Sequence, residues 1–283
     1  MSASSTRHDA HANCGCPVPP VGRTILAHDL HGTGPEKVVV LHSWMGNARS
    51  FDAVKPWLDT GAFTYAFADL RGYGRSRTFR GSFTAREAAT DALHLADHLG
   101  WRRFHVVGHS MSGLIVQRLI LDDWPRAERR IKSAVAITPV TADGFPADDP
   151  TKQFLWNLIH DVPLTAQGIA SLTGGRLPAR WTEALARDNV ATSDAEAMRA
   201  YYRMWIDGDF SAEVAAVKPG TPLQVIGGRQ DLPGFSEEKY RTTFGAWYAN
   251  VGFDFITDAG HFPMHEAPVY LAALLDAHLS RHR

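Results

Sequence analysis

The stretch FHVVGHSMSGLIVQRLIL, residues 104–121, decides the fold of this chain. Its first four residues form a short, mostly apolar run that is typical of a strand buried on both faces. Its last ten residues have the composition of a buried helix. Ser110 stands at the junction, with Gly108 two residues before it, Ser112 two residues after it and Gly113 next. Small residues at these positions leave room for a strained turn that presents a serine hydroxyl, so the stretch predicts a nucleophile elbow in which Ser112 replaces the usual second glycine.

The segments on either side alternate between strand and helix patterns. We expect strands at about 24–30, 38–41, 64–70, 104–107, 134–137, 222–226 and 253–256. We expect helices at about 48–58, 84–99, 112–121, 236–247 and 266–279. Such alternation indicates an α/β fold with a mostly parallel central sheet and helices on both faces.

The alternation stops between residues 141 and 217. This segment is rich in Ala, Leu, Trp and Tyr, and it is interrupted by Pro and Gly. We interpret it as a helical cap inserted over the strand ends, where substrate pockets form in α/β folds. The expected organisation is a flexible tail at 1–22, an α/β core at 23–140 and 218–283, and the cap at 141–217.

Composition narrows the class of protein. The chain has 283 residues, 45% of them apolar, and a formal net charge of −1. A large single core is expected, and nothing in the charge balance favours a nucleic-acid partner. There is no run of about 18 apolar residues, so no membrane span is expected. The first 20 residues lack an apolar signal-peptide core, which predicts a cytoplasmic protein. The oligomeric state is left open.

The two cysteines, Cys14 and Cys16, both lie in the N-terminal tail. Their spacing is too short for a structural disulfide framework, and we interpret the tail as a flexible leader in a reducing compartment. The alternative is a weak metal site made with His8 and His11. A metal site here would need further ligands, so no bound metal is expected.

Three more motifs carry a resemblance to a known family. They are LHSW at 41–44, DLRGYGRS at 69–76, and GHFP at 260–263 followed by Glu266 and Pro268. Together with the elbow, they make the chain similar to the α/β-hydrolase superfamily from about residue 24 to the C-terminus. The resemblance implies the α/β-hydrolase fold and a catalytic triad in the chain order Ser, Asp, His.

The candidate triad is Ser110, Asp231 and His261. A serine hydroxyl needs a base to take its proton, and His261 lies in the loop after the last strand. We interpret the rival His265 as a surface residue. Asp231 follows an apolar strand, where the family places its acid; its alternative role is to cap the next helix, and Asp258 is a rival acid.

By resemblance, the backbone N–H groups of Met111 and Trp44 form the oxyanion hole. His42 begins the loop that contains Trp44, and Ser43 replaces the glycine common at that point. The Trp44 indole is expected to give the pocket an aromatic wall and one N–H donor, with core packing as the alternative. His109, which precedes the nucleophile, is another candidate contact.

The cap supplies several aromatic residues, of which Trp156 and Trp205 are candidates for substrate contact. The alternative for each is packing within the cap. The other members of the group are Trp181, Tyr201 and Tyr202. As a group they favour an apolar, aromatic or acyl substrate. Asp69 and Arg71 are expected to be structural.

The leading hypothesis is a serine hydrolase that uses Ser110, His261 and Asp231. Its substrate is a small apolar or aromatic carbonyl compound: an ester, a lactone, a thioester or a carbon–carbon bond next to a carbonyl. The mechanism needs no metal and no organic cofactor. The related haloalkane dehalogenases and epoxide hydrolases carry aspartate at the nucleophile position, so Ser110 argues against both.

Two alternatives come from the same resemblance. Cofactor-independent dioxygenases of this fold cleave 3-hydroxy-4-quinolones with O2, and there His261 would be the base while Ser110 would bind the substrate. That group carries its acid after the sixth strand, where the nearest carboxylate is Asp143. The second alternative is a receptor-like ligand-binding protein, and the apparently complete triad argues against it.

Overall fold

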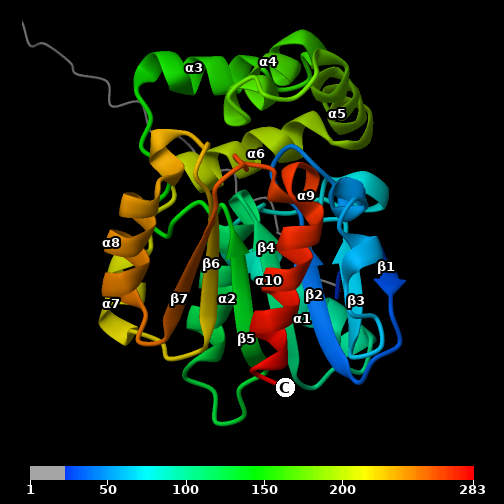
Figure 1. Ribbon diagram of the computed structural model, residues 1–283, viewed down its shortest axis with the longest axis vertical. Coiled ribbons are helices and arrows are strands. Elements are labelled where there is room, and N and C mark those ends of the chain that lie inside the picture. Colours follow the sequence, from blue (N-terminus) through cyan, green and yellow to red (C-terminus); the bar gives the residue numbers. More distant parts are fainter. Residues whose placement is uncertain (1–22) are drawn as a thin grey trace, which may run out of the picture.

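The computed structural model describes residues 23–283 (Figure 1). The expectations for residues 1–22 lie outside the described residues. These are the flexible leader and the alternative metal site at Cys14 and Cys16.

Within residues 23–283, one seven-stranded sheet forms the centre of the fold, in the order β1-β3-β2-β4-β5-β6-β7. Its strands are β1 (His28–His31), β2 (Glu36–Leu41), β3 (Phe63–Ala68), β4 (Phe104–His109), β5 (Ile131–Ile137), β6 (Leu223–Gly228) and β7 (Val251–Ile256). Only β1 pairs antiparallel, with β3; the other pairs are parallel. The predicted mostly parallel α/β sheet is confirmed.

Strand β4 lies in the middle of the sheet, between β2 and β5. Its register pairs Val106 with Val39 on one side and with Ala134 on the other. All residues of β4 are buried, because helices cover both faces of a parallel sheet. The elbow that follows β4 therefore lies at the centre of the carboxyl edge, where the ends of several strands come together.

Helices cover the two faces of the sheet. Helices α1 (Ala85–His98) and α2 (Met111–Asp123) lie behind it in Figure 1, and α10 (Pro268–Ser280) crosses in front. Helix α8 (Glu237–Trp247) precedes β7. Thr84 caps α1 by accepting the N–H of Glu87, as a Thr before a helix commonly does.

The helix expected at 48–58 is wrong. The segment forms two short 3₁₀ helices, η1 (Ala48–Phe51) and η2 (Lys55–Trp57). Pro56 has no N–H to donate and its ring clashes with a preceding helical turn, so a continuous helix is excluded. The closing helix expected at 266–279 forms as α10, which begins at Pro268 because a proline is tolerated in the first turn of a helix, and the short α9 (Pro263–Glu266) precedes it.

Between β5 and β6 the chain forms five helices. They are α3 (Asp149–Asn157), α4 (Val162–Leu172), α5 (Ala179–Thr192), α6 (Ala195–Asp207) and α7 (Ser211–Val217). Helices α3 to α6 lie over the carboxyl ends of the strands (Figure 1). Helix α7 instead packs beside α2 and α8 at the side of the sheet. The inserted region thus roofs the edge at which the elbow lies.

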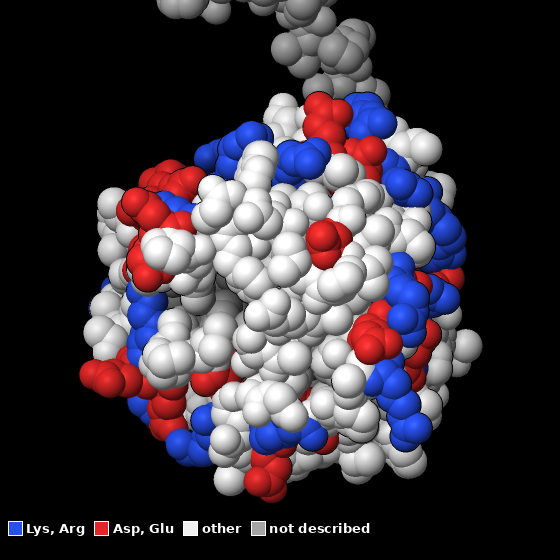
Figure 2. All heavy atoms as spheres, turned by 90° about the horizontal axis from the view of Figure 1, so that it is seen from above, with Lys and Arg blue, Asp and Glu red and all other residues white. Residues whose placement is uncertain are grey.

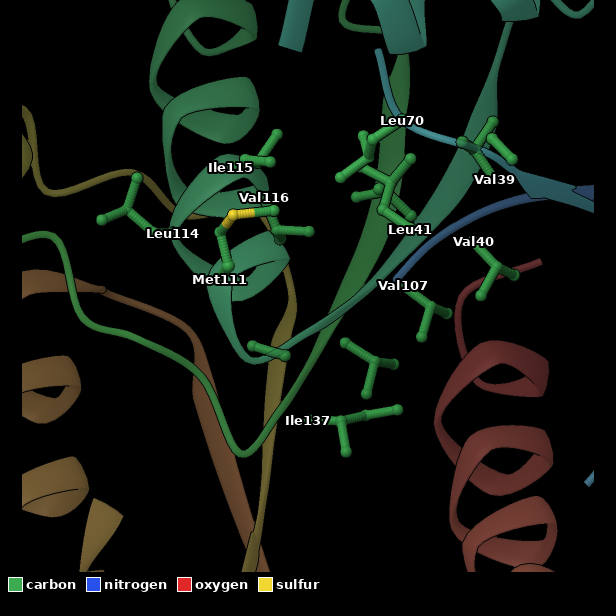
Figure 3. Packing of buried hydrophobic residues seen from close by; sticks show 14 of the residues in the cluster. Val39, Val40, Leu41, Leu70, Val107, Met111, Leu114, Ile115, Val116 and Ile137 are labelled. Carbon is green, nitrogen blue, oxygen red and sulfur yellow. The ribbon is translucent and has the colours of Figure 1, made fainter. Parts of the chain in front are cut away.

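Apolar side chains from the central strands and α2 pack around the elbow (Figure 3). Val39, Val107 and Ile137 of three neighbouring strands and Met111 and Ile115 of α2 are all almost completely buried. Burying a side chain of this size stabilises the fold by about 1.5–3 kcal/mol. This packing gives the turn after β4 a rigid support.

Candidate active site

Ser110 occupies a strained turn between β4 and α2. Its φ is +55°, in the left-handed region that non-glycine residues rarely adopt. The two neighbouring glycines are sterically required: a Cβ on Gly108 would lie 2.4 Å from the Ser112 carbonyl oxygen, and a Cβ on Gly113 would lie 2.2 Å from the Pro139 Cβ. The small residues noted in the sequence therefore let the helix cross closely over the strand.

The structure brings Ser110, His261 and Asp231 together. His261 Nε2 lies 2.8 Å from Ser110 Oγ, and His261 Nδ1 lies 2.7 Å from Asp231 Oδ2. The side chains of His261 and Asp231 are only 4% and 1% exposed. An ionised carboxylate can only accept, so Nδ1 carries the proton and Nε2 is left to accept the serine hydroxyl. Burial raises the pKa of the Asp231 carboxyl, although the charge and hydrogen bond of His261 act in the opposite direction.

The rival residues have other partners. The Asp143 carboxylate accepts from Lys239 Nζ at 2.6 Å and from Thr141 Oγ1. His265 is half-buried against the Trp181 ring, with centroids 5.3 Å apart, so its expected surface position is wrong. Neither Asp143 nor His265 pairs with His261, whose Nδ1 contacts Asp231.

The loop after β2 is fixed by its own histidine. His42 Nδ1–H donates to the Ser43 carbonyl at 2.7 Å, and Nε2 accepts the Leu70 N–H at 3.0 Å. Burial lowers the pKa of His42, so the ring stays neutral. Ser112 Oγ donates to the His42 carbonyl and ties this loop to the elbow. His42 therefore stabilises the loop after β2 through its hydrogen bonds. It is not among the residues that line the cavity next to Ser110.

The two backbone N–H groups expected to form the oxyanion hole make no internal hydrogen bond in the described part of the chain. Within residues 23–283, neither the Trp44 N–H nor the Met111 N–H makes a hydrogen bond. Met111 is the first residue of α2, and the first N–H groups of a helix have no partner inside it. Both groups are available to a ligand oxygen.

A cavity of about 250 Å³, here called the chamber, adjoins Ser110 and His261. Six aromatic residues line it: Trp44, Phe145, Phe154, Trp205, Phe235 and Phe262. Helices α3 and α4 add aliphatic side chains, with Ser43, Thr151 and Ser171 as the polar residues besides Ser110 and His261. Among residues 23–283, no Asp, Glu, Lys or Arg lines the chamber. Figure 2 shows the molecule from above, from the side on which α3 to α6 lie. Charged side chains gather at the rim of this surface, and most of its middle is uncharged.

The predicted aromatic contacts have different outcomes. Trp44 and Trp205 both line the chamber, with ring centroids 5.3 Å apart. The Trp44 indole N–H donates to the Met198 carbonyl at 2.9 Å, so the predicted donor into the pocket is wrong. Trp156 does not line the chamber, because its ring packs between Tyr202 and the guanidinium of Arg203, 5.1 Å from the ring centroid.

His109 also lies outside the chamber. Its side chain is completely buried behind the elbow, where Nε2 is 2.7 Å from the His261 carbonyl oxygen. Burial lowers the pKa of His109 well below its ordinary value. The predicted substrate contact is therefore wrong, and His109 contacts the backbone of His261 instead.

Glu266 stabilises the loop that carries His261. Its carboxylate accepts the Gly260 N–H at 2.9 Å and the Phe262 N–H at 3.0 Å, on either side of the histidine. It also pairs with Arg176, which follows the cap helix α4. The sequence motif contains Glu266, but the pattern alone does not reveal Arg176.

Sequence reasoning missed most of the chamber wall. Phe145 and Phe235 stack with centroids 4.9 Å apart, although Phe145 lies in a loop before α3 and Phe235 ends the short 3₁₀ helix η4 (Pro233–Phe235), far along the chain. Phe154 and Leu172 come from α3 and α4. Loops and single helical turns are too short to show a periodic pattern, and periodicity in α3 and α4 does not tell which apolar side chains face a cavity, so no local signal marks these side chains as pocket residues.

A mostly parallel sheet with a strained serine after its central strand, an acid after the last strand but one and a histidine after the last strand defines the α/β-hydrolase class. The chain belongs to the alpha/beta hydrolase family, whose model matches residues 38–274.

Curated relatives align over part of their length. A fluoroacetate dehalogenase from Burkholderia sp is 36% identical over 107 residues, which are 36% of this chain and 34% of that protein. A pimeloyl-[acyl-carrier protein] methyl ester esterase from Sodalis glossinidius is 30% identical over 171 residues, or 54% of this chain and 60% of the esterase. The alignments thus span from one third to three fifths of these two relatives.

Solved structures match nearly the whole chain. The enol-lactonase from Burkholderia xenovorans LB400 has a TM-score of 0.75 at 20% identity and covers 90% of this chain and 96% of the lactonase. The hydrolase olei00960 from Oleispira antarctica also has a TM-score of 0.75, at 16% identity, over 89% of this chain and 94% of its own. At these identities the likeness shows the fold.

Proposed function

We propose that this protein is a serine hydrolase that cleaves an uncharged, apolar or aromatic ester, lactone or thioester. The observation that carries the proposal is the placement of His261 between Ser110 and Asp231 at 2.8 and 2.7 Å, at the wall of an apolar chamber. A nucleophile within hydrogen-bond reach of an oriented base is the arrangement that activates a serine.

In the proposed mechanism, Ser110 Oγ attacks the substrate carbonyl carbon while His261 Nε2 takes the hydroxyl proton. The N–H groups of Trp44 and Met111 stabilise the negative oxygen that forms. His261 then returns the proton to the leaving oxygen or sulfur, and an acyl-enzyme remains. In the second half of the reaction, His261 Nε2 takes a proton from a water molecule while the water oxygen attacks the acyl carbon. The bond from that carbon to Ser110 Oγ then breaks, Oγ receives the proton from His261, and the carboxylic acid leaves. Asp231 holds the histidine ring and stabilises its charged form.

The chamber wall supports an uncharged substrate. No Asp, Glu, Lys or Arg of the described residues lines it, and burying an unpaired charge in an apolar site costs far more than one hydrogen bond returns. The same site chemistry extends to a carbon–carbon bond next to a carbonyl. The names of the methyl ester esterase among the relatives and of the enol-lactonase among the structures denote cleavage of an ester and of a lactone, which are bonds of the proposed kind.

The dioxygenase alternative receives no specific support. Its resemblance places the acid after the sixth strand, where Asp143 is paired with Lys239, whereas Asp231 pairs with His261. The receptor-like alternative is not favoured by any contact in the site. A cytoplasmic location remains a prediction; no helix in residues 23–283 is long and apolar enough to cross a membrane.

A panel of p-nitrophenyl esters tests the proposal. Butyrate, hexanoate and phenylacetate esters represent uncharged substrates, and the monosuccinate ester is the charged match for the butyrate ester. We expect kcat/KM for the butyrate ester to exceed that for the monosuccinate by about 100-fold, and Ser110→Ala to abolish both. Equal turnover by Ser110→Ala would overturn the mechanism, and preference for the monosuccinate would overturn the substrate class.

A further inference from the structure

The backbone carbonyl of His261 accepts two buried hydrogen bonds. His109 Nε2 lies 2.7 Å from this oxygen and Thr138 Oγ1 lies 3.1 Å from it. The three residues are between 0% and 3% exposed. His109 ends β4 and Thr138 follows β5, so the loop that carries His261 is fixed to the two central strands of the sheet.

The bond from His109 has a defined direction. A carbonyl oxygen only accepts, so His109 donates from Nε2. Burial keeps this ring neutral, and its other nitrogen, Nδ1, is buried without a partner within residues 23–283. A proton on Nδ1 would have no acceptor and would leave the His261 carbonyl without this donor, so the single ring proton of His109 is on Nε2.

The bond from Thr138 comes from a strained backbone. Thr138 has φ +40°, although it is β-branched and precedes a proline, and both properties disfavour that conformation. Its neighbours hold it there: Pro139 packs against the bare Cα of Gly113, and the Thr138 N–H donates to the Ile226 carbonyl at 2.7 Å. Strain of this kind persists where the surrounding structure fixes it, and it clusters at functional sites.

We propose that Thr138 and His109 are positioning residues, which hold His261 Nε2 within reach of Ser110 through the His261 backbone. The proposal rests on the serine-hydrolase function. The His261 N–H donates to the Leu172 carbonyl of α4 at 3.1 Å. The backbone of the histidine is therefore hydrogen-bonded to the inserted helices through its N–H and to the sheet through its carbonyl. Loss of the bonds from the sheet lets the ring shift toward the cap and away from the hydroxyl.

The test compares Thr138→Val with Thr138→Ser. Valine keeps the branched shape and loses the donor, whereas serine keeps the donor. We expect Thr138→Val to lower kcat by about tenfold, because small misplacements of a catalytic group are costly. KM is expected to stay within about twofold, because Thr138 does not line the chamber. Thr138→Ser is expected to keep kcat near the wild-type value, because its hydroxyl can donate to the same carbonyl.

The matched control is Thr243→Val. Thr243 Oγ1 donates to the Lys239 carbonyl at 2.7 Å in α8, remote from the chamber, so its loss should leave kcat unchanged. The rate of labelling by a fluorophosphonate gives a second readout of serine activation. It should fall by the same factor as kcat in Thr138→Val.

Three results would overturn the inference: unchanged kcat in Thr138→Val, a loss of kcat in Thr138→Ser as large as in Thr138→Val, or an equal loss in Thr243→Val. If Thr138→Val does not fold, His109→Phe removes the other donor and keeps an aromatic ring against Phe262, and the same kcat-selective loss is required. Absence of labelling in the wild type would instead refute the serine-hydrolase function on which the inference rests.

Discussion

At the scale of single residues, the site depends on backbone positions that few side chains tolerate. Ser110 has φ +55° and Thr138 has φ +40°, and conformations of this kind cost about 1–3 kcal/mol each. Both residues directly follow buried central strands. The packing of those strands offsets the cost, and the strained turns place a hydroxyl on each side of His261.

A pair of carboxylate variants tests the assignment of the acid. Asp231→Asn keeps the shape of the side chain but no longer holds the Nδ1 proton of His261, so the ring favours the wrong tautomer. We expect kcat to fall by about 10³–10⁴-fold while the fold is retained. Asp143→Asn is the control, because its carboxylate pairs with Lys239, and steady-state kinetics should match the wild type. The reverse pattern would move the acid role to Asp143.

At the scale of elements, the crossing of β4 by α2 depends on two bare Cα positions. The Cβ that Gly113 lacks would overlap Pro139, the residue after Thr138. The same glycine therefore sets the approach of the helix and the conformation of the loop that contacts the histidine. A sequence pattern shows the glycines, but only the structure shows which atoms they accommodate.

Two glycine-to-alanine variants test this packing. Gly113→Ala should destabilise the protein by about 1–3 kcal/mol, because the surrounding atoms are fixed backbone and a proline ring. Gly245→Ala in α8 has no atom within 4 Å of the new Cβ, so it should stabilise the protein by up to about 1 kcal/mol through helix propensity. Urea unfolding of both variants is the measurement. Small and equal changes in the free energy of unfolding would show that the contact between Gly113 and Pro139 has room for a methyl group.

The cap helices set the size of the chamber. A Cβ on Gly168 of α4 would lie 3.2 Å from Leu158 Cδ2, and both residues line the cavity. We expect Gly168→Leu to lower kcat/KM for the hexanoate ester by at least about tenfold more than for the acetate ester. The control is Gln167→Leu on the exposed face of the same helix. If both esters lose activity equally, Gly168 does not limit the acyl group.

The sequence predicted the parts of the fold that have a local signal. The runs at 38–41, 104–107 and 134–137 were recognisable as strands because both faces are buried, and the elbow was recognisable from its small residues. The chamber wall was not predictable, because Phe145 and Phe235 meet only after the cap and core pack together. The Trp44 indole was misassigned because its acceptor, the Met198 carbonyl, lies on a distant cap helix.

At the scale of the whole molecule, several histidines are folded into apolar surroundings. Burial lowers the pKa of His105 to about 4 and that of His278 to about 3, and it also lowers the pKa values of His42 and His109. At these four histidines, the unfolded chain therefore binds more protons than the folded chain between pH 6.5 and 4. Stability from these residues is present above pH 6.5 and is lost as the pH falls.

Removing one buried histidine should reduce this sensitivity to acid. His278→Leu replaces a side chain that is 4% exposed with an apolar one. Since one pKa unit corresponds to about 1.4 kcal/mol, we expect the variant to lose roughly 3 kcal/mol less stability than the wild type between pH 7 and pH 4. Chemical denaturation at several pH values measures the difference. Parallel stability curves would show that His278 becomes protonated in the folded state.

The central claim is that Ser110 is an activated nucleophile at the wall of an accessible chamber. Labelling with a fluorophosphonate, followed by intact mass measurement of the wild type and of Ser110→Ala, tests it directly. The account predicts one adduct on the wild type and none on the folded Ser110→Ala variant. A folded wild type that takes up no label, or a Ser110→Ala variant labelled as rapidly as the wild type, would contradict it.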